Sequence, residues 1–312
     1  MPYYAKKDVT VCKSEKRIPQ REDGWRLWFD MNIQFSKMQG AGNDFIVICA
    51  APGSDEERLR DTVTEQQIAR LCHRKLGIGA DGLFFLSPVG GSAARLKMDF
   101  YNCDGSRASM CGNGLRCASF FASRLPGGTK TPVFETDSGV LSTQVLADHG
   151  SRGEVRITVL VNEPFREVEC AGSPFRIFYG VAGVPHAVVL LDTDEPEDFD
   201  VLTHGRALRY HPRFAPAGTN VDFVAAKVGK NGAYAIRTYE RGVEDETLAC
   251  GTGISSAGAV FHHLDKNLQK VSFLSRSGDI LQVDISGECN ILKQVQLTGP
   301  AVEVFRGTVH TD

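Results

Sequence analysis

Short apolar segments with alternating polar residues recur along the chain from residue 34 onward, and this pattern predicts a fold dominated by strands. Because several segments alternate strictly, we expect mixed or antiparallel sheets with one solvated face. The expected strands are residues 34–38, 44–48, 83–86, 97–101, 154–161, 175–181, 187–191, 221–224, 233–239, 271–274, 280–285 and 292–297.

Helices are signalled at three places. Thr62 and Glu65 have the spacing of a capping box, and the apolar stripe after them predicts a helix that stops at Gly77. Residues 115–123 contain a single charged side chain and residues 254–261 contain none. Because a helix without a polar face is a buried helix, we expect each of these two to lie inside a sheet.

A sequence echo links the two halves of the chain. Residues 101–114 and 239–253 each start with a tyrosine, pass through a polar loop and reach Cys-Gly-x-Gly, at Cys111 and Cys250. Such self-similarity indicates duplicated domains. The polar, glycine-containing residues 147–153 give a boundary near the middle of the chain.

The predicted division has three parts. Residues 33–150 with 297–312 form the first domain, and residues 151–296 form the second. Residues 1–32 are mixed in charge without an apolar period, and we interpret them as an extension that is either disordered or the product of a start codon assigned too early.

Composition narrows the function. With 35 Lys and Arg against 38 Asp and Glu, the chain lacks the basic surface that nucleic acids or anionic membranes require. No apolar run approaches the ~20 residues of a membrane helix, and the nine cysteines show no C-x-x-C spacing of a structural zinc site. We therefore expect a soluble, cytoplasmic protein without a metal, acting on a small molecule.

The two echoed cysteines suggest chemistry. At a helix N-terminus the free N–H groups and the helix dipole favour an anion, so we expect both thiol pKa values to be lowered, and the N–H groups of Gly112, Asn113, Gly251 and Thr252 to hold a carboxylate. One thiolate and one thiol on opposite faces of a carbon would perform racemisation by two bases.

The other cysteines have a plainer interpretation. Free cysteine is among the most buried residue types, so we interpret the remaining seven as core or loop residues: Cys12, Cys49, Cys72, Cys103, Cys117, Cys170 and Cys289. A redox pair is the rival hypothesis for Cys111 and Cys250, but neither has an adjacent resolving cysteine.

Together these residues resemble the diaminopimelate epimerase family. The matching motifs, in family order, are residues 35–45 (FSKMQGAGNDF), 77–82 (GIGADG), 111–114 (CGNG), 185–186 (PH), 218–220 (GTN), 239–242 (YERG) and 249–253 (ACGTG). The resemblance implies an α/β (α+β) fold of two pseudo-symmetric domains, each a closed mixed or antiparallel sheet wrapped around a central helix. It also implies a homodimeric enzyme without a cofactor, which converts LL-diaminopimelate to the meso form for lysine and cell-wall synthesis.

The resemblance also assigns site residues. Cys111 and Cys250 would be the paired bases, and Glu240 and His186 would hold the amino group at the reacting carbon. The distal end of the substrate would be held by Asn43, Asn102, Asn220 and Arg241. Asp81 and Asp104, beside glycines, are interpreted as turn residues.

Two positions depart from the family pattern. Val184 stands where many members have an asparagine that contacts the distal end, and Gly82 stands where some have a glutamine. Loss of a polar contact relaxes discrimination between substrates. The sequence therefore leaves open a two-cysteine racemase of another amino acid, and a binding or thiol redox protein without racemase activity.

Overall fold

The computed structural model describes residues 31–108, 110–193, 196, 198–229, 231–285 and 292–311. Most of the predicted extension therefore lies outside the described residues, as does Cys289. The strands are β1 (Met31–Gly40), β2 (Asn43–Cys49), β3 (Gly82–Val89), β4 (Ser92–Asn102), β5 (Arg107–Ala108), β6 (Val133–Thr136), β7 (Gly139–His149), β8 (Arg152–Val168), β9 (Arg176–Ala182), β10 (Val184–Leu191), β11 (Asn220–Ala225), β12 (Tyr234–Glu240), β13 (Asp245–Thr247), β14 (Lys270–Leu274), β15 (Ile280–Asp284) and β16 (Gln294–Thr311). The helices are α1 (Asp55–Thr62), α2 (Glu65–Cys72), α3 (Gly112–Ser123), α4 (Val201–Arg209), α5 (Gly251–Leu264) and the short 3₁₀ turn η1 (Pro212–Phe214).

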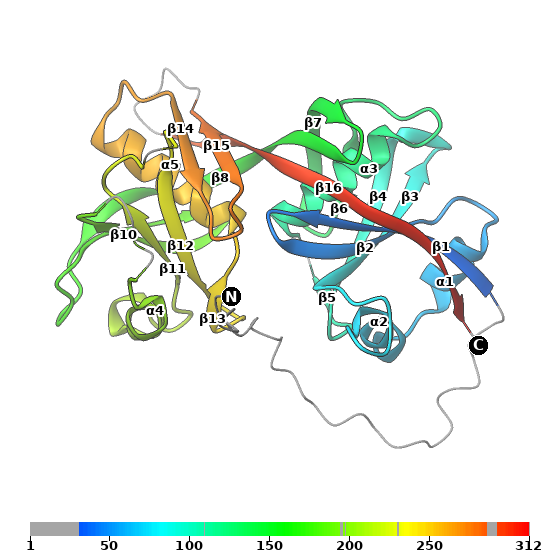
Figure 1. The fold of residues 1–312 in the computed structure, drawn as a ribbon, viewed down its shortest axis with the longest axis horizontal. Helices are drawn as coiled ribbons and strands as arrows, with labels where there is room; N and C mark the ends of the chain where they lie inside the picture. The colour runs from blue at the N-terminus through cyan, green and yellow to red at the C-terminus, as the bar shows by residue number, and fades with distance from the viewer. Residues whose placement is uncertain are drawn as a thin grey trace, which may run out of the picture.

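The molecule consists of two lobes, each a sheet around one helix (Figure 1). In the first lobe the pairings run β16-β1-β2-β3-β4-β6-β7-β8, and β8 pairs with β16 to close the ring. In the second lobe they run β8-β9-β10-β11-β12-β14-β15-β16, and the same β8–β16 pair closes it. The predicted fold class, two pseudo-symmetric α/β (α+β) domains with central helices, is confirmed.

The same order of pairings occurs in both lobes. β1–β2 and β9–β10 are antiparallel, β2–β3 and β10–β11 are parallel, and β3–β4 and β11–β12 are antiparallel. β4–β6 and β12–β14 are again both parallel. This repetition gives the sequence echo a structural meaning, because it places Cys111 and Cys250 at equivalent points of the two lobes.

The two long strands β8 and β16 pass from one lobe to the other. The first part of β8 pairs with β7 and its last part with β9, while β16 pairs first with β15 and then with β1. Figure 1 shows β16 crossing between the lobes. The predicted domain bounds, 33–150 with 297–312 and 151–296, remain a prediction. Residues 147–153, the predicted boundary, form the tight hairpin that joins β7 to β8.

Helices α3 and α5 form the cores of the lobes. Nine of the 12 residues of α3 and nine of the 14 residues of α5 are buried, as their lack of a polar face predicts. Around them lies one continuous apolar core that includes Phe84, Phe120, Val260 and Phe273. Within the described segments, no helix has the length and apolar character needed to span a membrane.

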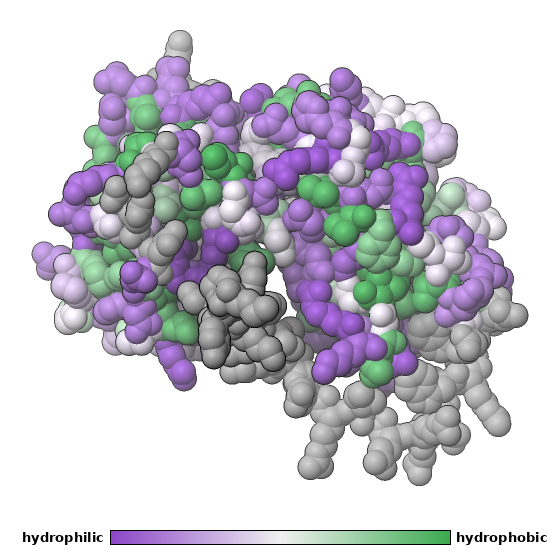
Figure 2. Space-filling model, viewed as in Figure 1, coloured by the Kyte–Doolittle hydropathy of each residue, from purple (hydrophilic) through white to green (hydrophobic). Residues whose placement is uncertain are grey.

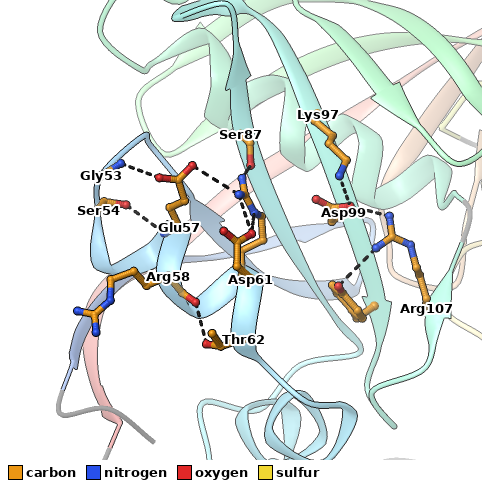
Figure 3. A network of polar contacts seen from close by, with 12 residues as sticks. Gly53, Ser54, Glu57, Arg58, Asp61, Thr62, Ser87, Lys97, Asp99 and Arg107 are labelled. Carbon is orange, nitrogen blue, oxygen red and sulfur yellow. Dashed lines mark hydrogen bonds and ion pairs between the residues drawn. The ribbon is translucent and has the colours of Figure 1, made fainter.

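The predicted capping box is displaced by two residues. Thr62 is the last residue of α1, and its hydroxyl donates to the Arg58 carbonyl at 2.7 Å (Figure 3). Thr64 caps α2 instead, with Gln67 completing the box. The sequence prediction was wrong here because it missed α1, a polar helix whose N-terminus is capped by Ser54.

Candidate active site

Cys111 and Cys250 each occupy the residue immediately before a central helix. Both have extended backbone angles and are the N-caps of α3 and α5, and neither thiol forms a side-chain capping bond. The free N–H groups of the first helical turn therefore surround each sulfur. This placement agrees with the prediction that both cysteines lie at the N-termini of buried helices.

The pKa of neither thiol is lowered. Burial raises the pKa of Cys111, opposed by backbone N–H groups of Gly114 and Asn113, and it raises the pKa of Cys250 well above its usual range. The carboxylate of Glu240 raises the pKa of both thiols further. The predicted lowering of both pKa values was therefore wrong, because desolvation outweighs the helix N–H groups.

The side of the site around Cys111 is built from β2 and the β4–β5 turn. The Cys111 thiol donates to Asn43 Oδ1 at 3.5 Å, and Asn43 Nδ2 donates to Asp81 Oδ2 at 2.8 Å. Asp81 is thus more than the predicted turn residue, because it also orients Asn43, which is predicted to contact the substrate. Asn102 donates to Ser106 across the turn at 3.0 Å, and Asp104 closes that turn by accepting from the Ser106 N–H at 3.0 Å.

A hydrogen bond from Asn113 joins the two half-sites, and Arg116 orients Asn113. Asn113 Nδ2 donates to the Ala249 carbonyl, the residue before Cys250, at 3.1 Å. Arg116 donates from Nη2 to Asn113 Oδ1 at 3.0 Å and from Nε to the Pro300 carbonyl at 3.2 Å. Arg116 is fully buried, and its Nη1 has no protein partner among the described residues. Sequence reasoning assigned no role to this arginine, because nothing near a lone charge in an apolar helix indicates its partners.

The side of the site around Cys250 contains a buried polar chain. The Cys250 sulfur lies 3.4 Å from Thr252 Oγ1, and Thr252 Oγ1 lies 2.9 Å from His186 Nε2. His186 Nδ1 contacts Asp222 Oδ2 at 2.7 Å. His186 and Asp222 have no solvent exposure. Asp222 was missed by sequence reasoning, because one acidic residue within an apolar strand resembles any other polar strand position.

The remaining predicted residues lie on β11 and at the end of β12. Asn220 donates from Nδ2 to the Pro185 carbonyl at 3.0 Å and accepts from the Arg241 backbone N–H at 2.8 Å. Burial raises the pKa of Glu240, while Thr247 and His186 oppose that rise. The Glu240 carboxylate is close enough to both thiols to raise their pKa values.

The structure shows what surrounds Gly82 and Val184, the two positions that depart from the family pattern. A Cβ at Gly82 would lie 2.7 Å from both the Phe100 ring and the Tyr101 carbonyl, so this backbone has no space for a longer side chain. Val184 begins β10, pairs with Ala182 and offers only hydrocarbon. On the face seen in Figure 2 the surface is hollowed between the two lobes, with hydrophilic residues along the border of the hollow.

Comparison with known families and proteins agrees with this geometry. The family model described as "Diaminopimelate epimerase" matches residues 35–160 and 178–303. The diaminopimelate epimerase of Hydrogenobaculum sp. is 38% identical over 277 residues, covering 87% of this chain and 96% of that protein. The diaminopimelate epimerase of Aquifex aeolicus is 38% identical over 280 residues, covering 88% and 97%.

Solved structures share the fold at low sequence identity. A PhzF-family phenazine biosynthesis protein from Bacillus anthracis superposes with a TM-score of 0.64 at 15% identity, covering 89% of this chain and 99% of that one. A hydroxyproline epimerase from Agrobacterium vitis, solved with trans-4-hydroxy-L-proline bound, gives 0.60 at 17% identity, covering 91% and 92%.

Proposed function

Because the chain belongs to the diaminopimelate epimerase family, a family of isomerases, we propose that it interconverts LL- and meso-2,6-diaminopimelate with Cys111 and Cys250 as its two bases. The observation that carries the mechanism is the placement of these cysteines at the N-termini of equivalent central helices, joined by the Asn113–Ala249 hydrogen bond. One sulfur removes the α-proton from one face of the carbon, and the other sulfur returns a proton to the opposite face.

The carboxylate at the reacting carbon must be stabilised as charge develops on it. We assign this role to the N–H groups of Gly112, Asn113, Gly251 and Thr252, because they begin two helices whose dipoles favour an anion. Fixed donors in a buried site are stronger than in water and need no reorganisation during the reaction. Two helix N-termini on one carboxylate replace the electron sink that a cofactor would supply.

The amino groups and the distal end have separate partners in this proposal. Glu240 holds the amino group of the reacting centre, whereas both ring nitrogens of the buried His186 are engaged by Asp222 and Thr252, so the predicted contact of His186 with that group is replaced by a role beside Cys250. Asn43, Asn102, Asn220 and Arg241 hold the distal end, with the Arg241 guanidinium matched to the distal carboxylate. Supporting this, Asn220 and Arg241 are already tied to each other by a hydrogen bond. We place the product in lysine and peptidoglycan precursor synthesis and expect a homodimer, which light scattering would measure.

The test is proton NMR of the purified protein with LL-diaminopimelate in deuterium oxide, with reductant and no pyridoxal phosphate. The expected result is loss of the α-proton signal as deuterium enters, together with the meso isomer. Val184 removes one polar contact to the distal end, so histidine, proline and glutamate are tested in parallel. Exchange on one of these but not on diaminopimelate would establish a racemase of another amino acid, and exchange on none would contradict the two-base proposal.

A further inference from the structure

The polar chain beside Cys250 is built across three neighbouring strands of the second lobe. His186 comes from β10, Asp222 from β11 and Thr238 from β12, and each is at most 3% exposed. Thr238 Oγ1 donates to Asp222 Oδ1 at 2.8 Å, and Asp222 Oδ2 lies 2.7 Å from His186 Nδ1. Both carboxylate oxygens of Asp222 therefore have a fixed partner.

These contacts decide which imidazole nitrogen carries the proton. A carboxylate can only accept hydrogen bonds, so in the neutral imidazole Nδ1 of His186 donates to Asp222 and Nε2 is left as an acceptor. Nε2 faces the Thr252 hydroxyl at 2.9 Å, and that hydroxyl lies 3.4 Å from the Cys250 sulfur. The hydrogen bonds thus run in one direction, from the thiol through the hydroxyl to the imidazole.

The equivalent place in the first lobe is entirely aromatic. Register pairs Phe84 of β3 with Phe100 of β4, as it pairs Asp222 with Thr238, and Phe45 follows the start of β2 by two residues, as His186 follows that of β10. The Phe84 ring lies 4.8 Å from Phe45 and 4.7 Å from Phe100, centroid to centroid.

The two helices also approach these side chains in the same way. A Cβ at Gly114 would lie 2.1 Å from Phe84 Cζ, and one at Gly253 would lie 2.1 Å from Asp222 Oδ1. The glycine three residues after each cysteine thus lets its helix rest on the equivalent strand residue. The second lobe has a carboxylate, an imidazole and a hydroxyl group where the first lobe has three phenyl rings.

This replacement is costly for folding. A buried carboxylate and imidazole lose their hydration, whereas three phenylalanines pack without that penalty. Packing therefore does not explain the polar set. The Cys111 thiol, by contrast, donates to the amide oxygen of Asn43, which takes no proton.

On the premise of the proposed function, we propose that Asp222, supported by Thr238, is a positioning residue that fixes His186 to receive the proton of Cys250 through Thr252. The Cys250 S–H proton passes to Thr252 Oγ1 as the Thr252 hydroxyl proton passes to His186 Nε2. The products are a Cys250 thiolate and an imidazolium that donates to the Asp222 carboxylate, and protons and charge balance without another reactant. The Cys111 thiol instead donates to the amide oxygen of Asn43, which takes no proton, so the two half-sites differ in what each thiol faces.

The variant that tests this is Asp222→Asn. The amide keeps the shape of the carboxylate, but its NH₂ group donates to His186 Nδ1 and forces the proton onto Nε2, which then cannot accept. We expect kcat to fall by about 100-fold or more with KM changed by less than about threefold, the size of a lost acid–base contribution. Alkylation of Cys250 by iodoacetamide, followed by peptide mass spectrometry, should slow by about tenfold while that of Cys111 changes by less than about twofold.

Two further variants make the result interpretable. Thr238→Val removes only the hydroxyl that orients Asp222 and should shift kcat and Cys250 alkylation in the same direction by a smaller factor. Asp284→Asn makes the same carboxylate-to-amide change at an ion pair with Arg156 in the second lobe and should leave both alkylation rates unchanged. If Asp222→Asn fails to fold, Thr238→Val decides.

Unchanged alkylation at Cys250, or equal slowing at both cysteines, would overturn the assignment of Asp222. This readout does not depend on turnover. A wild-type protein that exchanges no α-proton contradicts the proposed function, whereas an active wild type whose variants show no selective loss at Cys250 contradicts only the role of Asp222.

Discussion

At the scale of the residue, the two proposed bases differ in surroundings but should be equally indispensable. Each face of the α-carbon needs its own proton carrier, so Cys111→Ala and Cys250→Ala should each lower turnover by at least about 100-fold. Cys170, buried in the separate cluster around Phe223, provides the control, and Cys170→Ala should stay within about twofold of wild type. Activity is measured as appearance of the meso isomer, and substantial turnover by either single variant would contradict the two-base assignment.

The helix glycines give a second test at this scale. The Phe84 ring that a Cβ at Gly114 would strike is packed between Phe45 and Phe100 and has no space to move. Gly114→Ala should therefore lower the free energy of unfolding by about 1–3 kcal/mol, the cost of overpacking a core. At Gly112 the only atom near a new Cβ is Ile157 Cδ1, at 3.4 Å, so Gly112→Ala should change it by less than about 0.5 kcal/mol. Urea unfolding measures the free energy of unfolding of both variants. If Gly114→Ala were as stable as Gly112→Ala, the prediction would be wrong and α3 would be able to shift away from Phe84.

Whether a functional residue could be predicted from the sequence depends on whether the residues next to it in the chain form a recognisable motif. Cys111 and Cys250 were found because the Cys-Gly-x-Gly echo is local and repeated, and the structure places both as helix N-caps. Asp222 and Arg116 were not found, because their partners come from strands distant in the sequence. The assignments of Asn43, Asn102, Asn220, Glu240 and Arg241 as substrate ligands stay predictions until substrate is bound.

At the scale of the element, most strands with a buried face were predicted, whereas polar elements and the helix α4, which buries Val201, Gly205 and Leu208, were not. Every predicted strand overlaps a strand in the structure, and none extends more than two residues beyond it. β7 was missed because most of its residues are partly or fully exposed, and α1 because its side chains are nearly all charged. The strand predicted at residues 292–297 is the start of β16, which continues to Thr311 because its later part pairs with β1. No local sequence pattern indicates that pairing.

The capping of α2 offers a test for an element. Thr64 accepts from the Gln67 N–H, and the Gln67 side chain accepts from the Thr64 N–H at 2.8 Å. Thr64→Ala should therefore lower the free energy of unfolding by about 1 kcal/mol. Thr62→Ala, two residues earlier, removes only a bond to a carbonyl already inside α1 and should cost less than about 0.5 kcal/mol. Thermal or urea unfolding measures the stability of both variants. A larger loss in Thr62→Ala than in Thr64→Ala would favour the capping box predicted at Thr62 and Glu65.

At the scale of the whole molecule, duplication explains why the site has two similar halves. Each lobe closes a ring of strands around one apolar helix, and β8 and β16 belong to both rings. The cysteines at the helix N-termini are therefore held by the same framework, and Asn113, oriented by Arg116, connects that framework across the lobes. A carbon held between the lobes would meet one thiol from each.

Burial of thiols also links the stability of the whole molecule to alkaline pH. Burial raises the pKa of Cys72 and of Cys117 to about 12. A thiol in the unfolded chain titrates near ~8.5. Below that pH both states keep the proton and stability does not depend on it. Above it the unfolded state loses the proton first, so stability falls as pH rises from about 8.5 towards 12, by up to about 1.4 kcal/mol per pH unit for each thiol.

Cys117→Ala isolates this effect, because lysine and tyrosine side chains titrate in the same range in every variant. The free energy of unfolding, measured in urea from pH 7.5 to 10.5, should fall less steeply with pH in Cys117→Ala than in the wild type. Ala118→Gly lies next to it on α3, is equally buried and costs about 1 kcal/mol by helix propensity, but carries no thiol and should keep the wild-type slope. A wild-type slope in Cys117→Ala would mean that the pKa of this thiol is the same in the folded and the unfolded chain, and that its burial does not make the fold less stable at alkaline pH.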